Sequence, residues 1–441
     1  MRRLAAPLAL LVAFVASVTR IVELDTPWYL ACGRLIWRSR SLPAHDPFSY
    51  TSAHAWINHE YLAELLFAGL HHLTGAAGLC VLEGLVVVAL LAIVFTHSHH
   101  IGAWLVGALL TFVLREVVSP RAQLLSIVVF AMMLRLVLDD DEAARGRRLW
   151  WCIPLQVLFT QLHGGNPTGV ALLGLAFLAR PSRERFLVGV CVFLATFAGP
   201  FGWLVHLPYI LGQRTFDAVR EWQPLSNALL AGSPSHWVAL LLLGAGAAAA
   251  FSTRRRLHLL LVLLFSLLAA RHARMALEGS IVSTALVVRA LRRETSPWLL
   301  VLPALVLAAL LPSGSRRLGL GFEPDRYPIA ATAWLRANQP PGPMLNSYNY
   351  GGYLLWQWPE QKVFVDGRGI TVYDEAITGA LPALYDDLGG YAALQEKWGF
   401  RLAVLQRHGR GAQLAEWLPK QPGWSIAYED AATRVVERVL P

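Results

Sequence analysis

The sequence has little charge and few cysteines, and both shortages exclude classes of protein. Charged residues make up 15% of the 441 residues, whereas hydrophobic residues make up 55% and fall in long blocks without strict alternation. The cysteines Cys32, Cys80, Cys152 and Cys191 are scattered singly, so they predict neither a disulfide framework nor a zinc site. Long apolar blocks with so little charge indicate a polytopic α-helical membrane protein.

The net charge of +9 does not indicate nucleic-acid binding, because no nucleic-acid motif accompanies the arginines. If Arg2 and Arg3 are cytoplasmic, every strongly basic short loop falls on the inner side. The arginines of these loops are Arg145, Arg147, Arg148, Arg180, Arg183, Arg185, Arg254, Arg255, Arg256, Arg289, Arg292 and Arg293. This bias predicts a multi-pass protein of the cytoplasmic (inner) membrane, with the first long loop and the C-terminal part outside.

We expect about eleven transmembrane helices, several of them shorter than the ~20 residues of a straight span. The expected spans are Leu4–Val22, Ala76–Phe95, Ile101–Leu114, Pro120–Leu138, Leu149–Leu162, Pro167–Leu178, Phe186–Ala198, His236–Phe251, Leu257–Ala270, Met275–Val288 and Trp298–Leu311. Tyr61–Leu73 is expected to be a helix in the outer interface. Asp139–Glu142 is expected in a solvated inner loop, and the histidines His97, His99 and His100 in an inner turn.

The chain is expected to divide into two domains. Residues 1–312 form the predicted transmembrane domain, with a first outer loop of catalytic type at 23–75, and residues 313–441 form a soluble extracytoplasmic α/β domain. The predicted strands are Lys362–Val365, Leu402–Leu405, Ser425–Tyr428 and Arg434–Val439, and the predicted helices are Ile329–Ala337, Leu388–Trp398 and Gln413–Leu418. Their alternation is typical of a small α/β domain.

The first loop concentrates acids and aromatics beside the first span. Asp25, Asp46 and Glu60 are candidate catalytic residues, since acids at a membrane border can act as bases or metal ligands. Trp28 and His59 are candidates for binding the acceptor or a sugar. The alternative is a solvated loop with its aromatics in the headgroup belt. For Asp25, a helix N-cap fits the sequence Asp-Thr-Pro-Trp equally well.

Cations interrupt the apolar blocks at the predicted outer level. Arg271, His272 and Arg274 are candidates for binding a lipid-linked phosphate, because arginine makes bidentate phosphate contacts. Headgroup anchoring is the alternative. His163 lies in another outer turn, which is rich in glycine, and could line a cavity; it is a further candidate for binding the acceptor or a sugar. Glu221 adds an acid on the same predicted side.

Two motifs mark the C-terminal part, Asn346–Trp356 and Val363–Arg368. Gly351 and Gly352 permit close backbone approach, and flat aromatics beside them are of the kind that bind sugars. The candidate acceptor-binding or sugar-binding residues of these motifs are Tyr348, Tyr350, Trp356, Asp366 and Arg368. The alternative is a turn packed on core aromatics.

The order of these motifs resembles the GT-C superfamily of membrane glycosyltransferases. The resemblance is carried by Asp25, Trp28, Arg34, Asp46, Pro47 and Tyr348–Trp356. The order of parts in the chain is similar to that of the oligosaccharyltransferase catalytic subunit. It resembles more closely still the uncharacterised bacterial membrane proteins that have an Asp-Pro-Trp first loop and a Gly-Gly-Tyr-Leu…Asp-Gly-Arg tail.

The resemblance implies an inverting glycosyltransferase that takes a sugar from a polyprenyl-phosphate-linked donor in the membrane lipid. The acceptor would be a glycan, lipid or protein outside the membrane, and Asp25 would engage the acceptor or a metal. The family's second acidic pair is reduced here to Glu116, so no cofactor is certain and a divalent metal at Asp25 and Glu116 is left open. Tyr348-Asn349-Tyr350-Gly351 lacks the family's acid, so recognition of an Asn-X-Ser/Thr peptide does not carry over.

Two other functions remain open. A lipid-linked-sugar transporter or flippase would need ionisable groups near the bilayer midplane, and the expected spans are almost free of them. A non-catalytic GT-C-like assembly protein would keep the fold without the activity, which the single acid at Glu116 allows.

Overall fold

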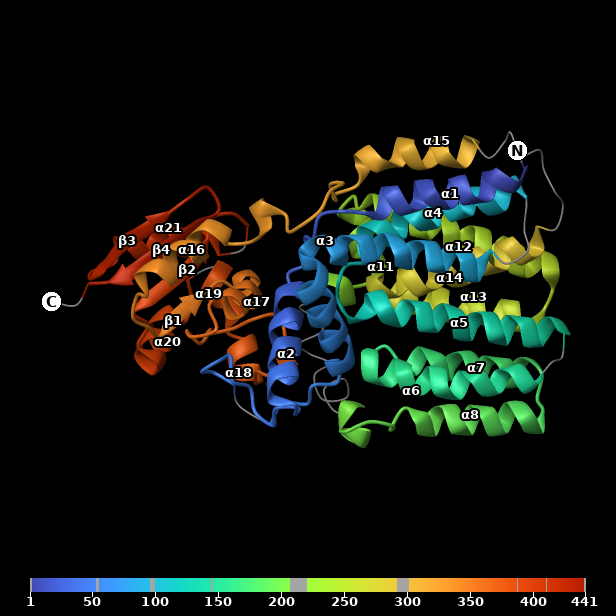
Figure 1. Cartoon of the computed structure of the whole chain (residues 1–441), viewed down its shortest axis with the longest axis horizontal. Coiled ribbons are helices and arrows are strands. Elements are labelled where there is room, and N and C mark those ends of the chain that lie inside the picture. The colour runs from blue at the N-terminus through green and yellow to red at the C-terminus, as the bar shows by residue number, and fades with distance from the viewer. Residues whose placement is uncertain are drawn as a thin grey trace. The chain divides into compact units, whose positions relative to one another are not determined.

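The structure is a computed structural model of the whole chain (Figure 1). It describes residues 2–52, 55–95, 100–143, 146–206, 220–291, 301–386, 388–409 and 411–439. Several residues named above lie outside these ranges, namely His97, His99, Arg145, Arg292 and Arg293, as does the beginning of the expected span Trp298–Leu311.

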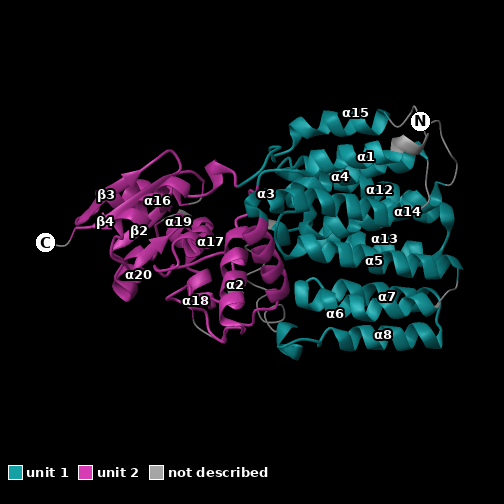
Figure 2. Ribbon diagram, viewed as in Figure 1, with its two compact units in different colours: residues 1–20, 74–206, 216–321 teal, residues 21–73, 207–215, 322–441 magenta. Residues whose placement is uncertain are grey.

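The chain forms two compact units (Figure 2). The described residues of the first, which we call the helical unit, fall within 2–20, 74–206 and 220–321. Those of the second, which we call the mixed unit, fall within 21–73 and 322–439. The predicted first loop is therefore grouped with the C-terminal sequence by its contacts. Whether the mixed unit is soluble and extracytoplasmic stays a prediction.

Apolar helices make up most of the helical unit. They are α1 (Arg2–Ser17), the second part of α3 (Tyr61–Val94), α4 (Ile101–Val117), α5 (Ala122–Ala143), α6 (Cys152–Leu162), α7 (Pro167–Ala179), α8 (Arg183–Ala195), α11 (Leu225–Leu230), α12 (Pro234–Thr253), α13 (Arg256–Arg271), α14 (Ala276–Ala290) and α15 (Val301–Leu310). Short 3-10 turns are η1 (Gly146–Trp151), η2 (Gly202–His206), η3 (Arg220–Trp222), η4 (Ala273–Met275) and η6 (Leu311–Ser313). In α14 every residue from Ala276 to Val288 is buried, so this helix forms the centre of the unit.

Among the described residues, three helices are long and apolar enough to cross a membrane, namely α3, α5 and α12. Shorter apolar helices occupy Ala6–Ser17, Pro167–Ala179 and Val301–Ser313. The total of about eleven spans stays a prediction. Helix α3 begins at Tyr61 as predicted, and Gly75 breaks its helical geometry with a φ of +66°, a conformation that favours glycine.

The acids predicted in a solvated inner loop belong instead to the last turns of α5. Each of three successive acids binds an arginine from another part of the helical unit, namely from α14, from α8 and from the residue directly before α13. The pairs are Asp139–Arg289 (2.6 Å), Asp140–Arg185 (2.6 Å) and Asp141–Arg255 (3.0 Å), which we call the arginine collar. Acids are unfavourable at a helix C-terminus, where the peptide dipole is negative, and the arginines offset this. Since Asp140 is buried as well, the loop prediction is wrong.

The residues predicted on the outer side lie at the other ends of the same helices. Arg274 lies just before α14 and His272 follows α13, and Arg121, which the sequence analysis did not single out, directly precedes α5 at the same end. The 22 residues of α5 span about 33 Å at the usual helical rise. The two predicted groups of charged residues are therefore separated along the helices. Which end faces the cytoplasm stays a prediction.

The mixed unit contains a four-stranded sheet in the order β1-β2-β4-β3. Its strands are β1 (Met344–Asn346), β2 (Leu402–Gln406), β3 (Trp424–Glu429) and β4 (Thr433–Arg438). β1 runs parallel to β2, whereas β4 is antiparallel to both of its neighbours. Its helices are α2 (Thr26–Ser39), the first part of α3, α16 (Ile329–Asn338), α17 (Tyr348–Gln357), α18 (Glu375–Thr378), α19 (Leu381–Asp386), α20 (Tyr391–Trp398) and α21 (Ala412–Trp417), with 3-10 turns η7 (Pro324–Arg326), η8 (Gly369–Thr371) and η9 (Leu418–Lys420).

Three of the four predicted strands are confirmed as β2, β3 and β4, and the three predicted helices as α16, α20 and α21. The strand predicted at Lys362–Val365 is wrong. The Asn346 side chain accepts a hydrogen bond from the Phe364 N–H at 2.8 Å, and the Val363 N–H donates to Phe48. The segment therefore makes one isolated parallel bridge, between Val363 and Ser49, and no ladder, and the missed strand β1 takes the edge of the sheet beside β2.

Candidate functional site

Arg368 and two aspartates form a closed ion cluster in the mixed unit. Arg368 donates to Asp46 at 2.6 Å through Nη1 and to Asp366 at 2.8 and 2.7 Å through Nε and Nη2. All three side chains are at most 1% exposed. The Tyr373 hydroxyl donates to Asp366 at 2.5 Å, and the Phe48 N–H donates to Asp46 at 3.1 Å. We call Asp46, Asp366 and Arg368 the buried cluster.

The geometry of the buried cluster favours a structural role. Burial raises the pKa of the Asp366 carboxyl, but Arg368 outweighs this effect and holds the pKa below its usual value. The rings of Phe48 and Trp56 lie 5.4 and 5.1 Å from the guanidinium, which limits access for water. An enclosed carboxylate that already accepts hydrogen bonds is poorly placed for a substrate hydroxyl. Catalysis by Asp46 and sugar binding by Asp366 and Arg368 stay predictions without support from this arrangement.

Asp25 lies at the N-cap position of α2, yet its side chain makes no capping hydrogen bond. Its Oδ1 accepts a hydrogen bond from the Trp28 indole at 3.0 Å instead. The side chain is half-buried, and Pro27 follows in the first turn of the helix. The carboxylate is therefore oriented by an indole in a half-buried residue. A purely capping role does not describe this side chain.

The Asp25 contact continues into a group of aromatic and ionisable side chains. Trp28 stacks on Tyr29 with ring centroids 3.9 Å apart, and the Tyr29 hydroxyl donates to Glu60. The Nε2 atom of His59 lies 3.7 Å from Glu60 Oε1. Trp28, Tyr29 and His59 are buried, whereas the Glu60 side chain is 14% exposed. We call these four residues and Asp25 the Asp25 group, and it includes four residues that the sequence predicted for the site.

Three glycines permit close packing around both clusters. A Cβ at Gly351 would lie 2.1 Å from the Val365 carbonyl oxygen, and one at Gly352 would lie 2.9 Å from another backbone oxygen. The prediction that these two glycines permit close backbone approach is confirmed. A Cβ at Gly367 would lie 2.3 Å from Asp25 Oδ1. Gly367 therefore packs against the Asp25 group, while its two chain neighbours belong to the buried cluster.

The predicted sugar-binding aromatics of α17 are largely core residues. Tyr350 is 1% exposed, and its hydroxyl donates to the Ala432 carbonyl at 2.9 Å. Trp356 is 6% exposed and packs against Phe322 with ring centroids 5.3 Å apart. Tyr348 is half-buried. The packing of Tyr350 and Trp356 agrees with the alternative of core aromatics, and sugar binding by these residues stays a prediction.

In the helical unit, Glu221 bridges two arginines that precede two helices. Arg121 Nη2 donates to Glu221 at 3.1 Å, and Arg274 Nη1 donates to its other oxygen at 3.0 Å. Arg274 Nη2 and His163 Nε2 are 3.3 Å apart, and His163 Nδ1 lies 3.1 Å from Ser126 Oγ. Because a guanidinium only donates, His163 accepts at Nε2 and carries its proton on Nδ1. We call Arg121, His163, Glu221 and Arg274 the Glu221 bridge.

The electrostatics of the Glu221 bridge suit an anion. Burial raises the pKa of Glu221, but Arg121 and Arg274 outweigh it and lower the pKa to about 2. The N-termini of α5 and α14 add partial positive charge. Both arginine side chains are 15% exposed, and Arg274 also lies over the Trp222 ring at 4.8 Å. Phosphate oxygens bind well to such oriented guanidinium groups.

The structure separates the three cations predicted to bind phosphate. Arg274 joins the Glu221 bridge. His272 Nδ1 donates to the Trp222 carbonyl at 2.8 Å, so this nitrogen is not available to a phosphate. Arg271 is exposed at the end of α13 and has no charged partner among the described residues. Arg271 and His272 as phosphate ligands stay predictions.

Glu116, the predicted alternative metal ligand, is held by protein donors. Its Oε1 pairs with Arg115 at 2.5 Å, and its Oε2 accepts from the Ser315 N–H at 2.7 Å and hydroxyl at 2.9 Å. Over the described ranges, no group of three or more His, Cys, Asp or Glu residues is arranged to hold a metal ion. Because both of its oxygens already accept from protein groups, Glu116 does not fit as a ligand of a divalent metal.

Three residues in or beside the buried cluster and the Glu221 bridge, namely Arg121, Glu278 and Tyr373, were not predicted from the sequence. Arg121 precedes an apolar block just as Arg274 does, so its position was a usable signal. Glu278 is buried in the first turn of α14, and its spacing of four residues from Arg274 was also visible. Tyr373 gave no signal, because its contact with Asp366 depends on the turn η8.

No protein-family model matches the chain, and no curated protein sequence matches it. Among solved structures, the archaeal oligosaccharyltransferase AglB from Archaeoglobus fulgidus, in complex with an inhibitory peptide and a dolichol-phosphate, gives a TM-score of 0.58 at 13% identity. That match covers 91% of this chain and 69% of the AglB chain. The same enzyme tethered to an acceptor peptide containing the NVT sequon gives 0.59 at 12% identity, over 91% and 68% of the two chains.

A third structure, ArnT from Cupriavidus metallidurans bound to undecaprenyl phosphate, covers 98% of this chain and 97% of its own at 14% identity. Its TM-score of 0.46 is too low to support an inference. The AglB matches confirm the similarity to GT-C membrane glycosyltransferases over most of the chain. At 12 to 13% identity they show the fold alone.

Proposed function

We propose that the chain is an integral membrane glycosyltransferase that uses a polyprenyl-phosphate-linked sugar as donor. The observation that supports this proposal is the Glu221 bridge, in which two arginines lie just before the N-termini of two helices. Arg274 has five N–H donors. Two of them make hydrogen bonds within the described residues, to Glu221 and His163, so donors remain for a phosphate. The fold is similar to that of AglB, which has been solved with a dolichol-phosphate.

In the proposed reaction, an acceptor oxygen outside the membrane attacks the anomeric carbon opposite the phosphate. The bond from that carbon to the phosphate oxygen breaks, and its electrons stay on the departing polyprenyl phosphate. Arg121 and Arg274 stabilise the negative charge that develops there. A base must take the proton of the acceptor hydroxyl. Asp25 stays the base predicted from the sequence, and its hydrogen bond from Trp28 holds its carboxylate in one orientation. The sugar changes configuration in this single displacement.

One observation favours a non-catalytic GT-C-like protein as the second candidate. Both oxygens of Glu116 are bound by protein groups, so the single acid that stands where the resemblance implies an acidic pair is already occupied. A non-catalytic protein would bind polyprenyl phosphate without turnover. A metal-independent transferase would do both.

Donor binding tests the proposal directly. The full-length protein in lipid nanodiscs is titrated with undecaprenyl phosphate, and Arg274→Gln and Arg121→Gln are each expected to weaken binding about tenfold, since a charged hydrogen bond to phosphate is lost. Arg183→Gln is the matched control, because Arg183 is an exposed arginine at the collar end of α8. Undiminished binding in both bridge variants would refute the proposed site. A loss in Arg271→Gln alone would restore the site predicted from the sequence.

We further propose that the bridge end of the helices and the C-terminus face outward. The arginines of the collar would then be cytoplasmic, in agreement with the positive-inside rule. A reporter that is active only outside the cytoplasm, fused after Pro441, is expected to be active. A stable, inserted but inactive fusion would contradict this orientation.

A further inference from the structure

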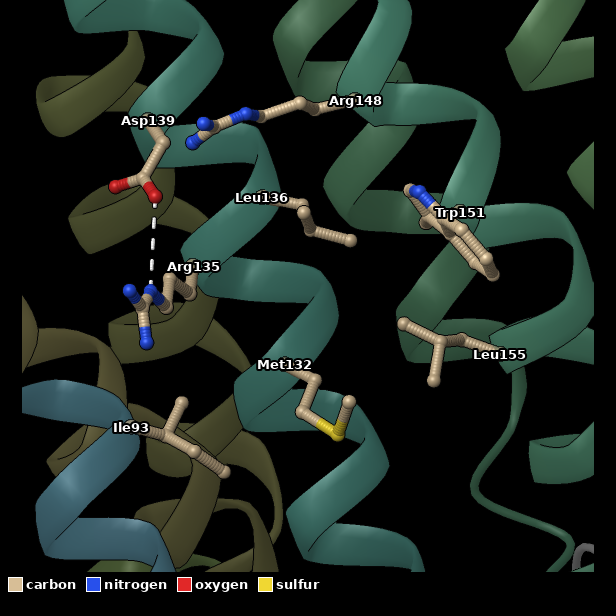
Figure 3. Close-up of a pocket in the computed structure, with 8 residues that line it drawn as sticks. All are labelled: Ile93, Met132, Arg135, Leu136, Asp139, Arg148, Trp151 and Leu155. Carbon is tan, nitrogen blue, oxygen red and sulfur yellow. Dashed lines mark ion pairs between the residues drawn. The ribbon is translucent and has the colours of Figure 1, made fainter.

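A groove opens beside α5 near the arginine collar, away from the Glu221 bridge. It has a volume of about 450 Å³ and is lined by Ile93, Met132, Arg135, Leu136, Asp139, Arg148, Trp151 and Leu155 (Figure 3). One wall is the last part of α5, and the facing wall is η1 with the start of α6. All of these residues belong to the helical unit.

The groove changes from apolar to charged along α5. Met132 and Asp139 are seven residues apart, which corresponds to about 10 Å along the helix axis. Ile93, Met132 and Leu155 line the apolar part (Figure 3). An elongated ligand with one apolar and one charged end therefore matches the lining better than a uniformly polar one.

The charged end of the groove favours an anion. Asp139 is already bound by Arg289 at 2.6 Å, and Arg135 lies 3.6 Å from its other oxygen. Arg148 is exposed and has no charged partner among the described residues. At its charged rim, the lining therefore presents Arg135 and Arg148 around one carboxylate, Asp139. Arg289 pairs both with Asp139 and, at 3.3 Å, with Glu142.

Exposed tryptophans indicate the level of this rim relative to a bilayer. Trp150 is 43% exposed and Trp151 is 65% exposed, and both lie in η1 beside Arg148. Tryptophan is enriched at the boundary between hydrocarbon and water. Helix α5 is apolar enough to cross a membrane, and it ends in the charged residues of the collar. The charged rim of the groove is therefore expected at the level of the lipid headgroups, with the apolar part of the groove at the level of the acyl chains.

We propose that this groove binds one anionic phospholipid of the surrounding bilayer. The phosphodiester and headgroup lie between Arg135 and Arg148, and one acyl chain lies along Met132, Leu136 and Leu155. The charge complementarity selects an anionic lipid over a zwitterionic one. This assignment does not depend on glycosyl transfer.

The test uses the purified full-length protein with equimolar phosphatidylglycerol and phosphatidylcholine of the same acyl chains. Lipids retained on the protein are counted by native mass spectrometry. The wild type is expected to retain phosphatidylglycerol about tenfold over phosphatidylcholine, since each cation near a lipid headgroup contributes about fivefold at most. The double variant Arg135→Gln, Arg148→Gln is expected to lose this preference.

Arg147→Gln is the matched control, because Arg147 is the exposed chain neighbour of Arg148 and does not line the groove. Met132→Trp, which fills the apolar end, is expected to reduce retention of both lipids. Equal retention of the two lipids by the wild type would overturn the proposal. So would an equal loss in Arg147→Gln, which would show general surface attraction, or displacement of phosphatidylglycerol by an equal concentration of undecaprenyl phosphate.

Discussion

Arg368 and Glu221 each bridge two groups of opposite charge, but with the signs reversed. Arg368 binds two aspartates in the mixed unit, and the three side chains are at most 1% exposed. Glu221 binds two arginines in the helical unit, with arginine side chains that are 15% exposed. The first arrangement is closed around its cation. The second keeps cations at the surface of the group, where a ligand can reach them.

The difference teaches that ion pairing alone does not mark a functional site. A buried pair contributes little net stability compared with an apolar replacement, yet removing one partner is costly. A partly exposed pair contributes less, but its donors can exchange a protein oxygen for a ligand oxygen. The exposure of the shared group therefore decides which of the two bridges is a candidate site.

The largest expected effect comes from opening the closed bridge. Arg368→Leu leaves Asp46 and Asp366 buried without their cation and is expected to lower the free energy of unfolding by about 3 to 5 kcal/mol. Unfolding in guanidinium chloride, followed by tryptophan fluorescence, measures the change. Arg401→Leu, at an exposed arginine of the same unit, is the control. Equal stability of the two variants would show that the buried cluster is not a structural tie.

Asp25→Asn separates a base from a structural aspartate. The Asn carbonyl oxygen can still accept the Trp28 hydrogen bond, but it cannot take a proton. Sugar transfer to an external acceptor is expected to fall by about 10² to 10⁴, with unfolding unchanged. If transfer survives, Asp25 only orients neighbouring groups, and the base must be sought at Asp46, Glu60 or Glu116.

Gly367→Ala tests whether the position of Asp25 matters as well as its charge. The new Cβ would meet Asp25 Oδ1 at 2.3 Å, so the carboxylate must move away from Trp28. A displacement of about 1 Å can reduce turnover by up to about 10². We expect transfer to fall about tenfold or more while the buried cluster keeps its stability. A large loss of stability with normal transfer would assign Gly367 to packing alone.

The smallest expected effect is the pH dependence of the open bridge. The pKa of Glu221 is lowered from its usual 4.5 to about 2 by the two arginines that outweigh its burial. The bridge therefore stabilises the fold fully above about pH 4.5, and this contribution is lost as the pH falls toward 2. At pH 7, Glu221→Gln is expected to be less stable by about 1 to 2 kcal/mol, because partial exposure weakens the pair.

The difference between wild type and Glu221→Gln should shrink between pH 4.5 and 2. Glu396→Gln, at an exposed glutamate, controls for general effects of charge. A difference that is constant over this range would mean that the carboxylate does not interact with Arg121 and Arg274 as described.

The helical architecture could be predicted from the sequence because hydrophobic blocks and basic loops report local environment. The C-terminal strands β2, β3 and β4 were found by the same local patterns. The strand predicted at Lys362–Val365 failed because a single side chain, Asn346, takes the N–H of Phe364. Such a replacement depends on tertiary contacts, which periodicity does not report.

For the candidate site, the sequence identified the residue types and the predicted side but not the partners. His163, Glu221 and Arg274 were expected on one side, and they meet in one bridge. Arg121 lies 100 residues from Glu221, and Asp46 lies 322 residues from Arg368. Pairs at such separations follow from the fold. The sequence therefore could not distinguish the enclosed carboxylate of Asp46 from the half-buried residue Asp25.

The arginine collar also fixes an order of assembly. Its acids are synthesised together at the end of α5, whereas Arg185 follows Asp140 after 45 residues, Arg255 follows Asp141 after 114, and Arg289 follows Asp139 after 150. The last pair can form only when the ribosome has completed α14. A chain released after α12 would therefore carry Asp139 without Arg289 and Asp141 without Arg255, a chemical mark by which cellular quality control could distinguish an unfinished copy from a finished one.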